Sequence, residues 1–264
     1  MLLTVAARDT TIVFGLYTGR GESAALVRDW RMRTDPHLTA DELALTMRGM
    51  LGEHADAITG AAVLSTVPQL RRELRTMLRE YYRDVPRVII EPGVRTGVPL
   101  LVDNPKDVGG DRLVNALAAH RIQPERPCVV VDFGTATVVD AVSAKGEFLG
   151  GAFAPGIEIS LEALAARAAS LRTVELVRPR SVIGKTTVEC LQSGVLYGFA
   201  GQVDGLVSRV AAELAPDEQD AVDVIATGGL APMILKESRT ISYYRPDLTL
   251  LGLRYAYERN VVEQ

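Results

Sequence analysis

The chain has 264 residues, of which 47% are apolar and 23% charged, and its formal net charge is −4; this composition is typical of a globular protein with one large or two moderate domains. The mild acidity, with arginines scattered among acidic residues, argues against direct nucleic-acid binding. No apolar run reaches the roughly 18 residues of a membrane helix, and the first residues lack the basic segment of a signal peptide, so we expect a cytoplasmic protein without a membrane partner.

The first part of the chain alternates short strands and helices. Residues 2–6 and 11–17 are β-like runs that predict a hairpin, and the T-x-x-E pattern at Thr39 and Glu42 predicts a helix start. A buried strand is predicted over 61–68, followed by a second helix. The apolar face of that helix comprises Leu70, Leu74, Met77, Leu78 and Tyr81.

The later part of the chain begins with another group of strands. Residues 127–156 predict three strands joined by two turns, and helices are predicted from about Ser160 and over 187–214. The run VDVIATGGLAP predicts a strand that ends in a glycine turn, and residues 247–258 predict a C-terminal helix. Together the two parts indicate an α/β protein.

Cysteines and histidines give no sign of a metal or disulfide framework. Cys128 and Cys190 are far apart, lack metal-ligand spacing and lie in apolar segments, so we interpret both as buried small side chains. The three histidines form no HExxH motif or His/Cys cluster, so zinc is not expected.

An internal similarity predicts two related lobes. LLTVAARDTTIVFGL aligns with VVVDFGTATVVDAV at an offset of 126 residues, which places Ala6 on Asp132 and Arg8 on Gly134. Each segment reads as strand, tight turn and strand. We therefore expect two duplicated ribonuclease H-like or actin-like lobes, over residues 1–122 and 123–264, with a ligand-binding cleft between them.

The turn after the strand that ends at Asp132 is a candidate phosphate site. Gly134 allows close approach of the backbone to an anion, and Thr135 adds a hydroxyl donor. Asp132 could hold a cation or orient water. The alternative interpretation is a plain hairpin with a turn aspartate.

The matching turn in the first lobe lacks both the acid and the glycine. Arg8 could replace a metal ion and bind phosphate directly, or it could simply pair with Asp9 in a site that has lost its ligand. Asp9 adds a negative charge that would repel a polyphosphate. The residues leave both interpretations open.

The segment 93–112 is long for a loop in a compact protein and rich in Gly, Pro, Asp and Asn, which is typical of a functional loop. It ends in DVGGDR, where Asp111 is predicted in the first turn of a helix. A carboxylate there could accept a proton from a substrate hydroxyl, and Arg112 could hold an anion. Alternatively, Asp111 is a helix cap and Arg112 a surface charge.

Two further segments resemble known nucleotide-binding motifs. ATGG at 226–229 could receive a base or ribose, or could be an ordinary turn. GKTT at 184–187 resembles the end of a Walker A motif, but Arg180 stands where that motif requires glycine, so a P-loop is rejected.

Taken together, these motifs resemble those of the type III pantothenate kinase family, within the acetate and sugar kinase/Hsp70/actin superfamily. The resemblance covers nearly the whole chain. Beyond the N-terminal hairpin, it rests on GVRTGVPLLVDNPKDVGGDR, VVVDFGTATVVDAVSAKGEFLGGAFAPG, RPRSVIGKTTVECLQSGVLYGFAGQVDGLV, IATGG and DLTLLGLRYAYERN. It implies ATP-dependent phosphorylation of pantothenate in coenzyme A biosynthesis, with Mg²⁺, a monovalent cation (K⁺ or NH₄⁺), and a homodimer whose active site lies near the subunit interface.

The resemblance also implies roles for individual positions. Asp111 matches the family's proton acceptor and Asp132 its monovalent-cation ligand. The positions that match pantothenate contacts are Val102, Gly109, Gly110, Arg112 and Thr187. The positions that match nucleotide contacts are Ala6, Ala7, Arg8, Asp9, Thr10, Thr11, Ile12, Val13, Gly134 and Thr135.

The sequence departs from the family pattern at several of these positions. The phosphate loop of the family reads Asp-x-Gly-Asn-Thr, and in the segment 6–10 only Thr10 matches it. Gly110 replaces a usual alanine, Val102 stands where many members have tyrosine, and Thr186 replaces a usual asparagine. Loss of one oriented donor typically costs roughly 100- to 1000-fold in rate, so the altered loop bears directly on activity.

Three hypotheses follow. The chain is a pantothenate kinase in which Arg8 partly replaces the metal. Alternatively, it is a non-catalytic pseudokinase that binds a metabolite and acts as a regulatory, transcription-linked accessory factor. A third hypothesis, motivated by Val102 and Thr186, is a kinase for a different hydroxyl compound.

Overall fold

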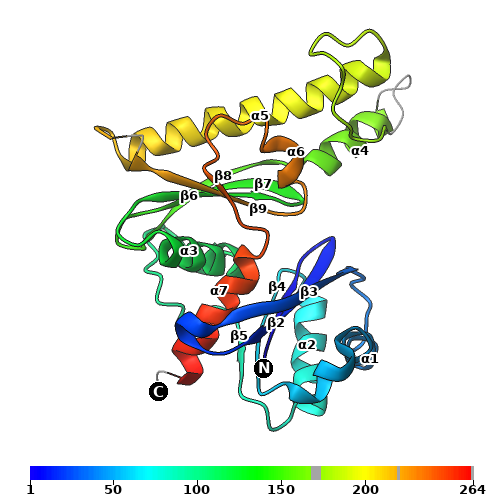
Figure 1. Cartoon of the computed structure of the whole chain (residues 1–264), viewed down its shortest axis with the longest axis vertical. Helices are drawn as coiled ribbons and strands as arrows, with labels where there is room; N and C mark the ends of the chain where they lie inside the picture. Colours follow the sequence, from blue (N-terminus) through cyan, green and yellow to red (C-terminus); the bar gives the residue numbers. More distant parts are fainter. Residues whose placement is uncertain (168–173, 219–220, 263–264) are drawn as a thin grey trace. The chain divides into compact units, whose positions relative to one another are not determined.

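The computed structural model describes residues 1–167, 174–218 and 221–262. Its internal contacts divide the chain into two compact units (Figure 1). The first unit comprises Met1–Pro99, Asp103–Ala118 and Asp247–Gln264, and the second comprises Leu100–Val102 and Ala119–Pro246. The sequence placed all residues after 122 in the second lobe. The structure instead groups the C-terminal segment with the first unit, because Leu250 and Leu253 belong to that unit's core.

The first unit is built on a five-stranded sheet of order β3-β2-β1-β4-β5. Its strands are β1 (Leu2–Ala7), β2 (Thr11–Thr18), β3 (Ala25–Arg33), β4 (Gly60–Ser65) and β5 (Arg87–Ile89). The first three form an antiparallel meander, and β4 and β5 continue the sheet in parallel with β1. Because successive side chains of a strand point to opposite faces, β1 contributes to two cores, one on each face of the sheet.

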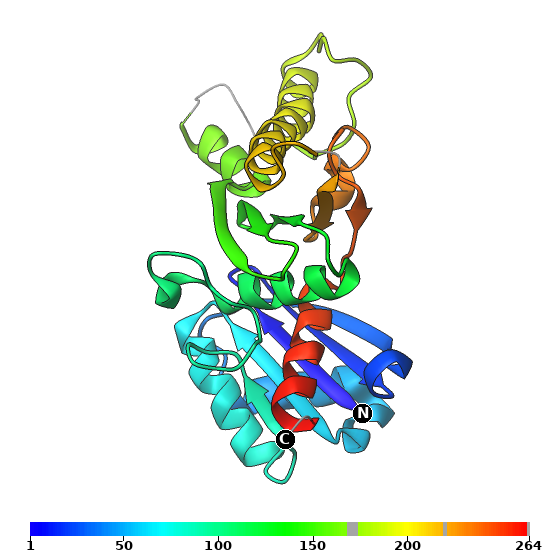
Figure 2. The same ribbon diagram turned by 90° about the vertical axis from the view of Figure 1, so that its left-hand side faces the viewer.

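Helices cover both faces of this sheet (Figure 2). The helices of the unit are α1 (Ala40–Leu51), α2 (Pro68–Tyr81), α3 (Gly110–Ile122, which continues into the second unit) and α7 (Leu248–Tyr257). The apolar faces of α1 and α2 pack on Leu3 and Val5, whereas α3 and α7 pack on the face that carries Ala6 and Leu64. Short helical turns occur over Gly21–Ser23, Gly52–Ala57, Pro105–Asp107 and Glu258–Val262.

The second unit repeats the same design, with a sheet of order β10-β9-β6-β7-β8. Its strands are β6 (Cys128–Phe133), β7 (Ala136–Val142), β8 (Phe148–Pro155), β9 (Asp223–Thr227) and β10 (Tyr243–Tyr244). Its helices are α4 (Ile157–Arg167), α5 (Thr187–Leu214) and α6 (Ala231–Ile234). Apolar residues of all three helices form one core with the inward face of the sheet.

The two sheets confirm the predicted duplication. In each, three antiparallel strands are followed by two strands parallel to the first. The bounds of β1 and β6 are separated at both ends by the predicted 126 residues. Each unit is therefore an α/β lobe, and the matching strand order shows that the two lobes are related.

Several predicted elements differ from the structure in detail. The helix expected from about Ser160 begins at Ile157, and Pro68 begins α2 instead of ending a strand, because proline is favoured in the first turn of a helix. Cys128 is buried as expected, but Cys190 is exposed. The prediction for Cys190 was wrong because its helix α5 presents that face to solvent.

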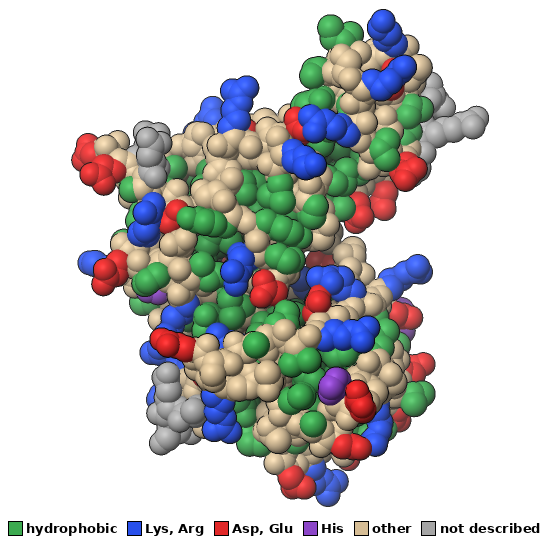
Figure 3. Space-filling view, viewed as in Figure 1, with side chains coloured by type: hydrophobic (Ala, Val, Ile, Leu, Met, Phe, Trp, Pro, Cys, Tyr) green, Lys and Arg blue, Asp and Glu red, His purple; other side chains and the backbone are tan. Residues whose placement is uncertain are grey.

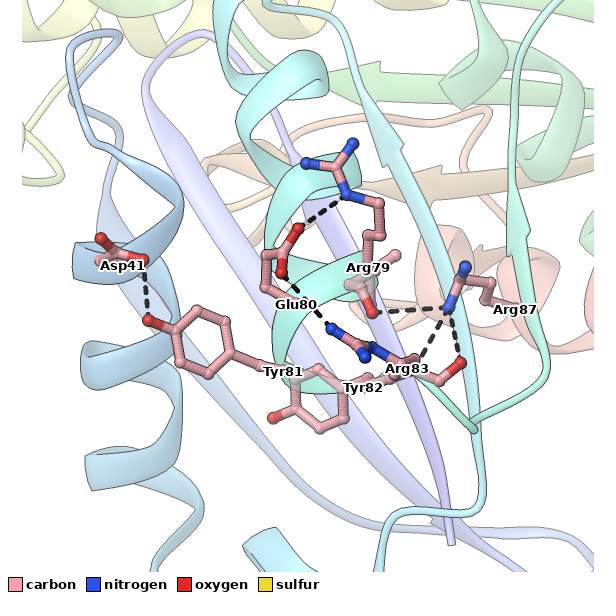
Figure 4. Close-up of polar contacts among 8 residues, drawn as sticks. Asp41, Arg79, Glu80, Tyr81, Tyr82, Arg83 and Arg87 are labelled. Carbon is pink, nitrogen blue, oxygen red and sulfur yellow. Dashed lines mark hydrogen bonds and ion pairs between the residues drawn. The ribbon is translucent and has the colours of Figure 1, made fainter.

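Tyr81 was also placed wrongly, since it is 53% exposed at the end of α2. Its hydroxyl donates to Asp41 Oδ1 of α1 at 2.7 Å (Figure 4). The same helix end is capped by Arg87 Nη1, which donates to the carbonyl oxygens of Leu78, Tyr82 and Arg83. These polar contacts explain why an aromatic residue at helical spacing lies outside the core.

The charged side chains are interspersed on the visible surface. On the face shown in Figure 3, lysine and arginine alternate with acidic side chains and form no single basic patch. Among the described residues, the structure has no helix of the length and apolar character needed to span a bilayer.

Candidate functional site

The turn between β1 and β2 is held by two threonines from neighbouring segments. Thr34 Oγ1 donates to the carbonyl oxygen of Arg8 at 2.6 Å, and the Thr34 amide donates to the carbonyl oxygen of Thr10 at 3.0 Å. Thr66 donates through its amide to Ala7 O and through its hydroxyl to Asp9 Oδ1. These bonds fix the backbone of the turn, and the Thr66 hydroxyl also holds the Asp9 side chain.

The predicted nucleotide-contact residues of this turn divide into two groups. Ala6, Ala7 and Ile12 are buried in the cores on the two faces of the sheet, so they can offer only backbone groups. The polar members, Arg8, Asp9, Thr10 and Thr11, are exposed or half-buried, and Val13 is half-buried. A ligand at this turn would therefore meet one guanidinium, one carboxylate and two hydroxyls.

A salt bridge joins Arg8 of the β1–β2 turn to Asp111. Arg8 Nη2 lies 2.8 Å from Asp111 Oδ2, and the two side chains are 24% and 15% exposed. Asp111 lies in the first turn of α3, as predicted. Sequence reasoning considered Asp9 as the partner of Arg8 and missed this pair, because its members are separated by 103 residues.

Gly109 shapes the position of the Asp111 carboxylate. A Cβ atom on Gly109 would lie 2.6 Å from Asp111 Oδ1, which is closer than a side chain tolerates. At Gly110 the nearest atom to such a Cβ is Ile90 Cγ2, at 3.0 Å. Gly109 therefore lets the carboxylate fold back over the start of the helix, whereas Gly110 allows close packing against Ile90.

Other predicted members of this loop lie around Asp111 in sequence. Arg112 is half-buried. Asp107 is exposed and accepts a hydrogen bond from Asn104 Nδ2 at 2.7 Å. One turn further along α3, Asn115 is 2% exposed and accepts from Thr249 Oγ1 of α7 at 2.8 Å. Its spacing of four from Asp111 could have drawn attention to it.

In the second unit, two of the predicted glycine turns lie against each other. Asp132 is the next-to-last residue of β6 and is 5% exposed. The Gly134 amide donates to Ala136 O at 3.1 Å, which closes the turn. Gly228 of the ATGG turn has φ +95°, and a Cβ there would lie 2.4 Å from Phe133 O. The two turns thus form one continuous backbone surface at the ends of β6 and β9.

The remaining predicted contacts also belong to the second unit. Val102 lies beside β8, where its Cγ1 is 3.7 Å from the position of a Cβ on Gly150. Thr187 is the exposed first residue of α5, after the N-cap Thr186. The structure therefore brings together Arg8, Gly109 and Asp111 in one unit, and the residues around Asp132 in the other.

The two hairpins differ in their capacity to hold a cation. Asp132 is a buried carboxylate at a strand end, and oxygen donors of this kind suit K⁺ and Mg²⁺. Ala6, the equivalent position in the first unit, has no side-chain oxygen. Within the described ranges, no group of three or more His, Cys, Asp and Glu side chains could form a complete metal site. Of these two equivalent positions, Asp132 offers a carboxylate oxygen to a cation and Ala6 does not.

Comparison with known proteins gives one consistent family. The family model for type III pantothenate kinase matches residues 2–209. A relative from Saccharopolyspora erythraea named type III pantothenate kinase is 68% identical over 263 residues, covering 98% of this chain and 99% of the relative.

Solved structures support the fold. A Campylobacter jejuni protein described as a Baf family transcriptional activator has a TM-score of 0.57 at 15% identity, with 98% of both chains covered. A Listeria monocytogenes protein described as an N-acetylmannosamine kinase has a TM-score of 0.55 at 14% identity, again with 98% coverage of both chains. At these identities the likeness concerns the two-lobed fold alone.

Proposed function

Because the chain belongs to the type III pantothenate kinase family, we propose that it transfers the terminal phosphoryl group of ATP to the hydroxyl group of pantothenate. The observation that carries this proposal within the structure is the placement of Asp111. Its carboxylate lies in the first turn of α3, is mostly shielded from solvent, and is in direct contact with a cation from the β1–β2 turn. A general base and a phosphate-binding group thus occur in one unit.

In the proposed reaction, Asp111 accepts the proton of the pantothenate hydroxyl. The hydroxyl oxygen then forms a bond to the terminal phosphorus of ATP, and the bond from that phosphorus to the bridging oxygen breaks. The products are phosphorylated pantothenate, ADP and a proton. Since the transition state spreads negative charge over phosphoryl oxygens, positioned donors and cations supply most of the catalysis.

The other residues bind and orient the two substrates. The backbone of the turn over residues 6–13 faces the phosphates, with Arg8 as its cation. At the second turn, Gly134 leaves room for the nucleotide to approach the backbone, and Thr135 offers it a hydroxyl donor. Pantothenate contacts are assigned to Val102, Gly109, Gly110, Arg112 and Thr187. These assignments rest on the family pattern and on the exposure of the polar members.

Two cations belong to the proposal. Asp132 would hold a monovalent ion, K⁺ or NH₄⁺, through its buried carboxylate. Magnesium, which would arrive with ATP, neutralises phosphate charge when bound. In the first unit, Ala6 has no side-chain oxygen to hold a metal, and Arg8 supplies the positive charge instead. The proposal also includes a homodimer in the cytoplasm, by analogy with the family.

The named relative supports an enzyme, and the comparisons give no support to the non-catalytic alternative. The test is a turnover assay with ATP, Mg²⁺, K⁺ and pantothenate that measures ADP release and identifies phosphorylated pantothenate by mass spectrometry. Asp111→Asn should lower kcat by roughly 100- to 10,000-fold, the usual contribution of a general base. Arg48→Gln, which breaks an exposed ion pair elsewhere in the first unit, is the matched control.

Ordinary turnover by the Asp111→Asn protein would refute the assigned base. Absence of any product from the wild-type protein, with pantothenate binding retained, would favour the metabolite-binding alternative. Faster turnover of another hydroxyl compound than of pantothenate would instead support the third hypothesis.

A further inference from the structure

The salt bridge between Arg8 and Asp111 brings the assigned phosphate-binding cation into contact with the assigned proton acceptor. Arg8 comes from the turn assigned to phosphate, and Asp111 is the assigned proton acceptor. At 2.8 Å, Arg8 Nη2 occupies the hydrogen-bonding range of Asp111 Oδ2. A guanidinium carries donors only and stays charged at neutral pH, so Arg8 takes no part in proton transfer and, while bound, occupies Asp111 Oδ2 at the expense of a substrate hydroxyl.

The surroundings restrict the ways in which this contact can change. The backbone of Arg8 is fixed on both sides, by the bond from its amide to Thr11 O at 3.1 Å and by the bond from Thr34 to its carbonyl oxygen. Asp111 is held at the start of α3, close over Gly109. A change of partner would therefore take place by rotation of the Arg8 side chain and of the Asp111 carboxylate.

A bound nucleotide would compete for the same guanidinium. The terminal phosphate of ATP carries more negative charge than one carboxylate and presents several oxygens with the geometry that arginine binds bidentately. Within reach of the β1–β2 turn, it is the stronger acceptor. ADP lacks that phosphate and would not compete in the same way.

We propose that Arg8 exchanges partners during the catalytic cycle. It holds Asp111 while the nucleotide site is empty and moves to the terminal phosphate when ATP binds, so that the base is released only when the phosphoryl donor is present. Arg8 is then both a phosphate ligand and a positioning residue for Asp111. This inference rests on the proposed function, because it takes the base and the phosphate turn from it.

The exchange predicts a measurable coupling between the two substrates. If pantothenate must displace Arg8 from Asp111, ATP should tighten pantothenate binding by relieving that competition. For a partly exposed ion pair we expect about a fivefold effect, equivalent to about 1 kcal/mol. By linkage, pantothenate should tighten binding of the ATP analogue by the same factor.

The experiment is calorimetric titration of the full chain with pantothenate, alone, with a non-hydrolysable ATP analogue and Mg²⁺, and with ADP and Mg²⁺. The proteins are the wild type, Arg8→Gln, Arg8→Lys and the control Arg48→Gln. In the wild type and the control, the ATP analogue should tighten pantothenate binding about fivefold and ADP should not. In Arg8→Gln the coupling should vanish and the affinity for pantothenate alone should rise. Arg8→Lys, which keeps the charge, should restore part of the coupling.

Steady-state kinetics on the same proteins provides the second measurement. Arg8→Gln should raise KM for ATP and lower kcat, with no rise in KM for pantothenate, a split that general damage to the fold would not produce. Equal coupling in wild type and Arg8→Gln, or equal effects of ADP and the ATP analogue, would overturn the partner exchange even if turnover is normal. A wild-type protein that binds neither substrate would overturn the proposed function itself, and the exchange with it.

Discussion

Substitution of Gly109 by alanine should displace the Asp111 carboxylate and lower kcat without destabilising the fold. The new Cβ would lie 2.6 Å from Asp111 Oδ1, whereas ordinary contacts begin at 3.4 Å. The carboxylate must therefore move by about 0.8 Å, and it can do so because it is the end of a flexible side chain. A misplacement of about 1 Å can cost on the order of 100-fold in rate, so we expect kcat to fall by about that factor.

Stability should change little in the same variant. Gly109 is not among the glycines with positive φ, so alanine meets no backbone strain there. Reduced freedom of the unfolded chain favours the variant by about 0.4–1 kcal/mol, which offsets the small rearrangement. Urea denaturation followed by circular dichroism should give a midpoint close to that of the wild type.

Gly49→Ala in α1 is the matched control, because Gly49 lies away from every residue assigned to a substrate. A Cβ on Gly49 would meet no atom within 4 Å, and Gly49 has no positive φ. We expect less than about a threefold change in kcat, because the reacting groups keep their positions. Wild-type activity in Gly109→Ala, or equal losses in both variants, would refute the role assigned to the glycine.

Three further predictions concern the packing and chemistry of the rest of the chain. Gly252→Ala should destabilise the first unit by about 3 kcal/mol or more, because its Cβ would lie 2.0 Å from Val114 O in α3. A denaturation midpoint equal to that of the wild type would contradict this packing. Asp204 accepts hydrogen bonds from Ser238, Arg239 and Thr240; burial opposes the lowering of its pKa, but these bonds outweigh it and hold the pKa below its ordinary value. A carboxyl group whose pKa is lowered by folding stabilises the fold at pH values above its unfolded-state pKa, and this stabilisation is lost as the pH falls. Asp204→Asn should therefore lower the free energy of unfolding by about 1 kcal/mol at pH 7 and leave it unchanged near pH 2. Urea denaturation at both pH values measures the difference. Burial raises the pKa of the Cys128 thiol to about 12, whereas Cys190 is exposed. Iodoacetamide should therefore label only Cys190 in the native protein. Detection of modified Cys128 by mass spectrometry would show the prediction to be wrong.

Local patterns predicted the elements of this fold well. The capping box at Thr39 and Glu42 is formed as expected, and α5 has the predicted bounds 187–214. The offset of 126 residues located β6 from β1 because a duplicated strand keeps its register. Each of these signals is contained in a short segment or in a comparison of two segments.

The features that sequence reasoning missed depend on contacts between distant segments. The position of α7 in the first unit follows from packing of Leu250 and Leu253, and no local pattern indicates which core a helix joins. The partner of Arg8 depends on how the long loop delivers Asp111 to the β1–β2 turn. Hydrophobic periodicity also cannot show that Tyr81 will bond to Asp41 and stay exposed.

The two duplicated hairpins differ in the groups that they could present to an anion or a cation. In the second unit buried Asp132 is the next-to-last residue of β6 and Gly134 lies in the turn, so this hairpin presents a carboxylate and an uncluttered backbone. At the equivalent positions the first unit has Ala6, buried and without polar atoms, and Arg8, which brings its own positive charge. A side-chain cation needs no acidic residue to hold it, so the loss of an acid at position 6 and the gain of arginine at position 8 are chemically consistent changes. Asp111 supplies an anionic partner for this cation at 2.8 Å.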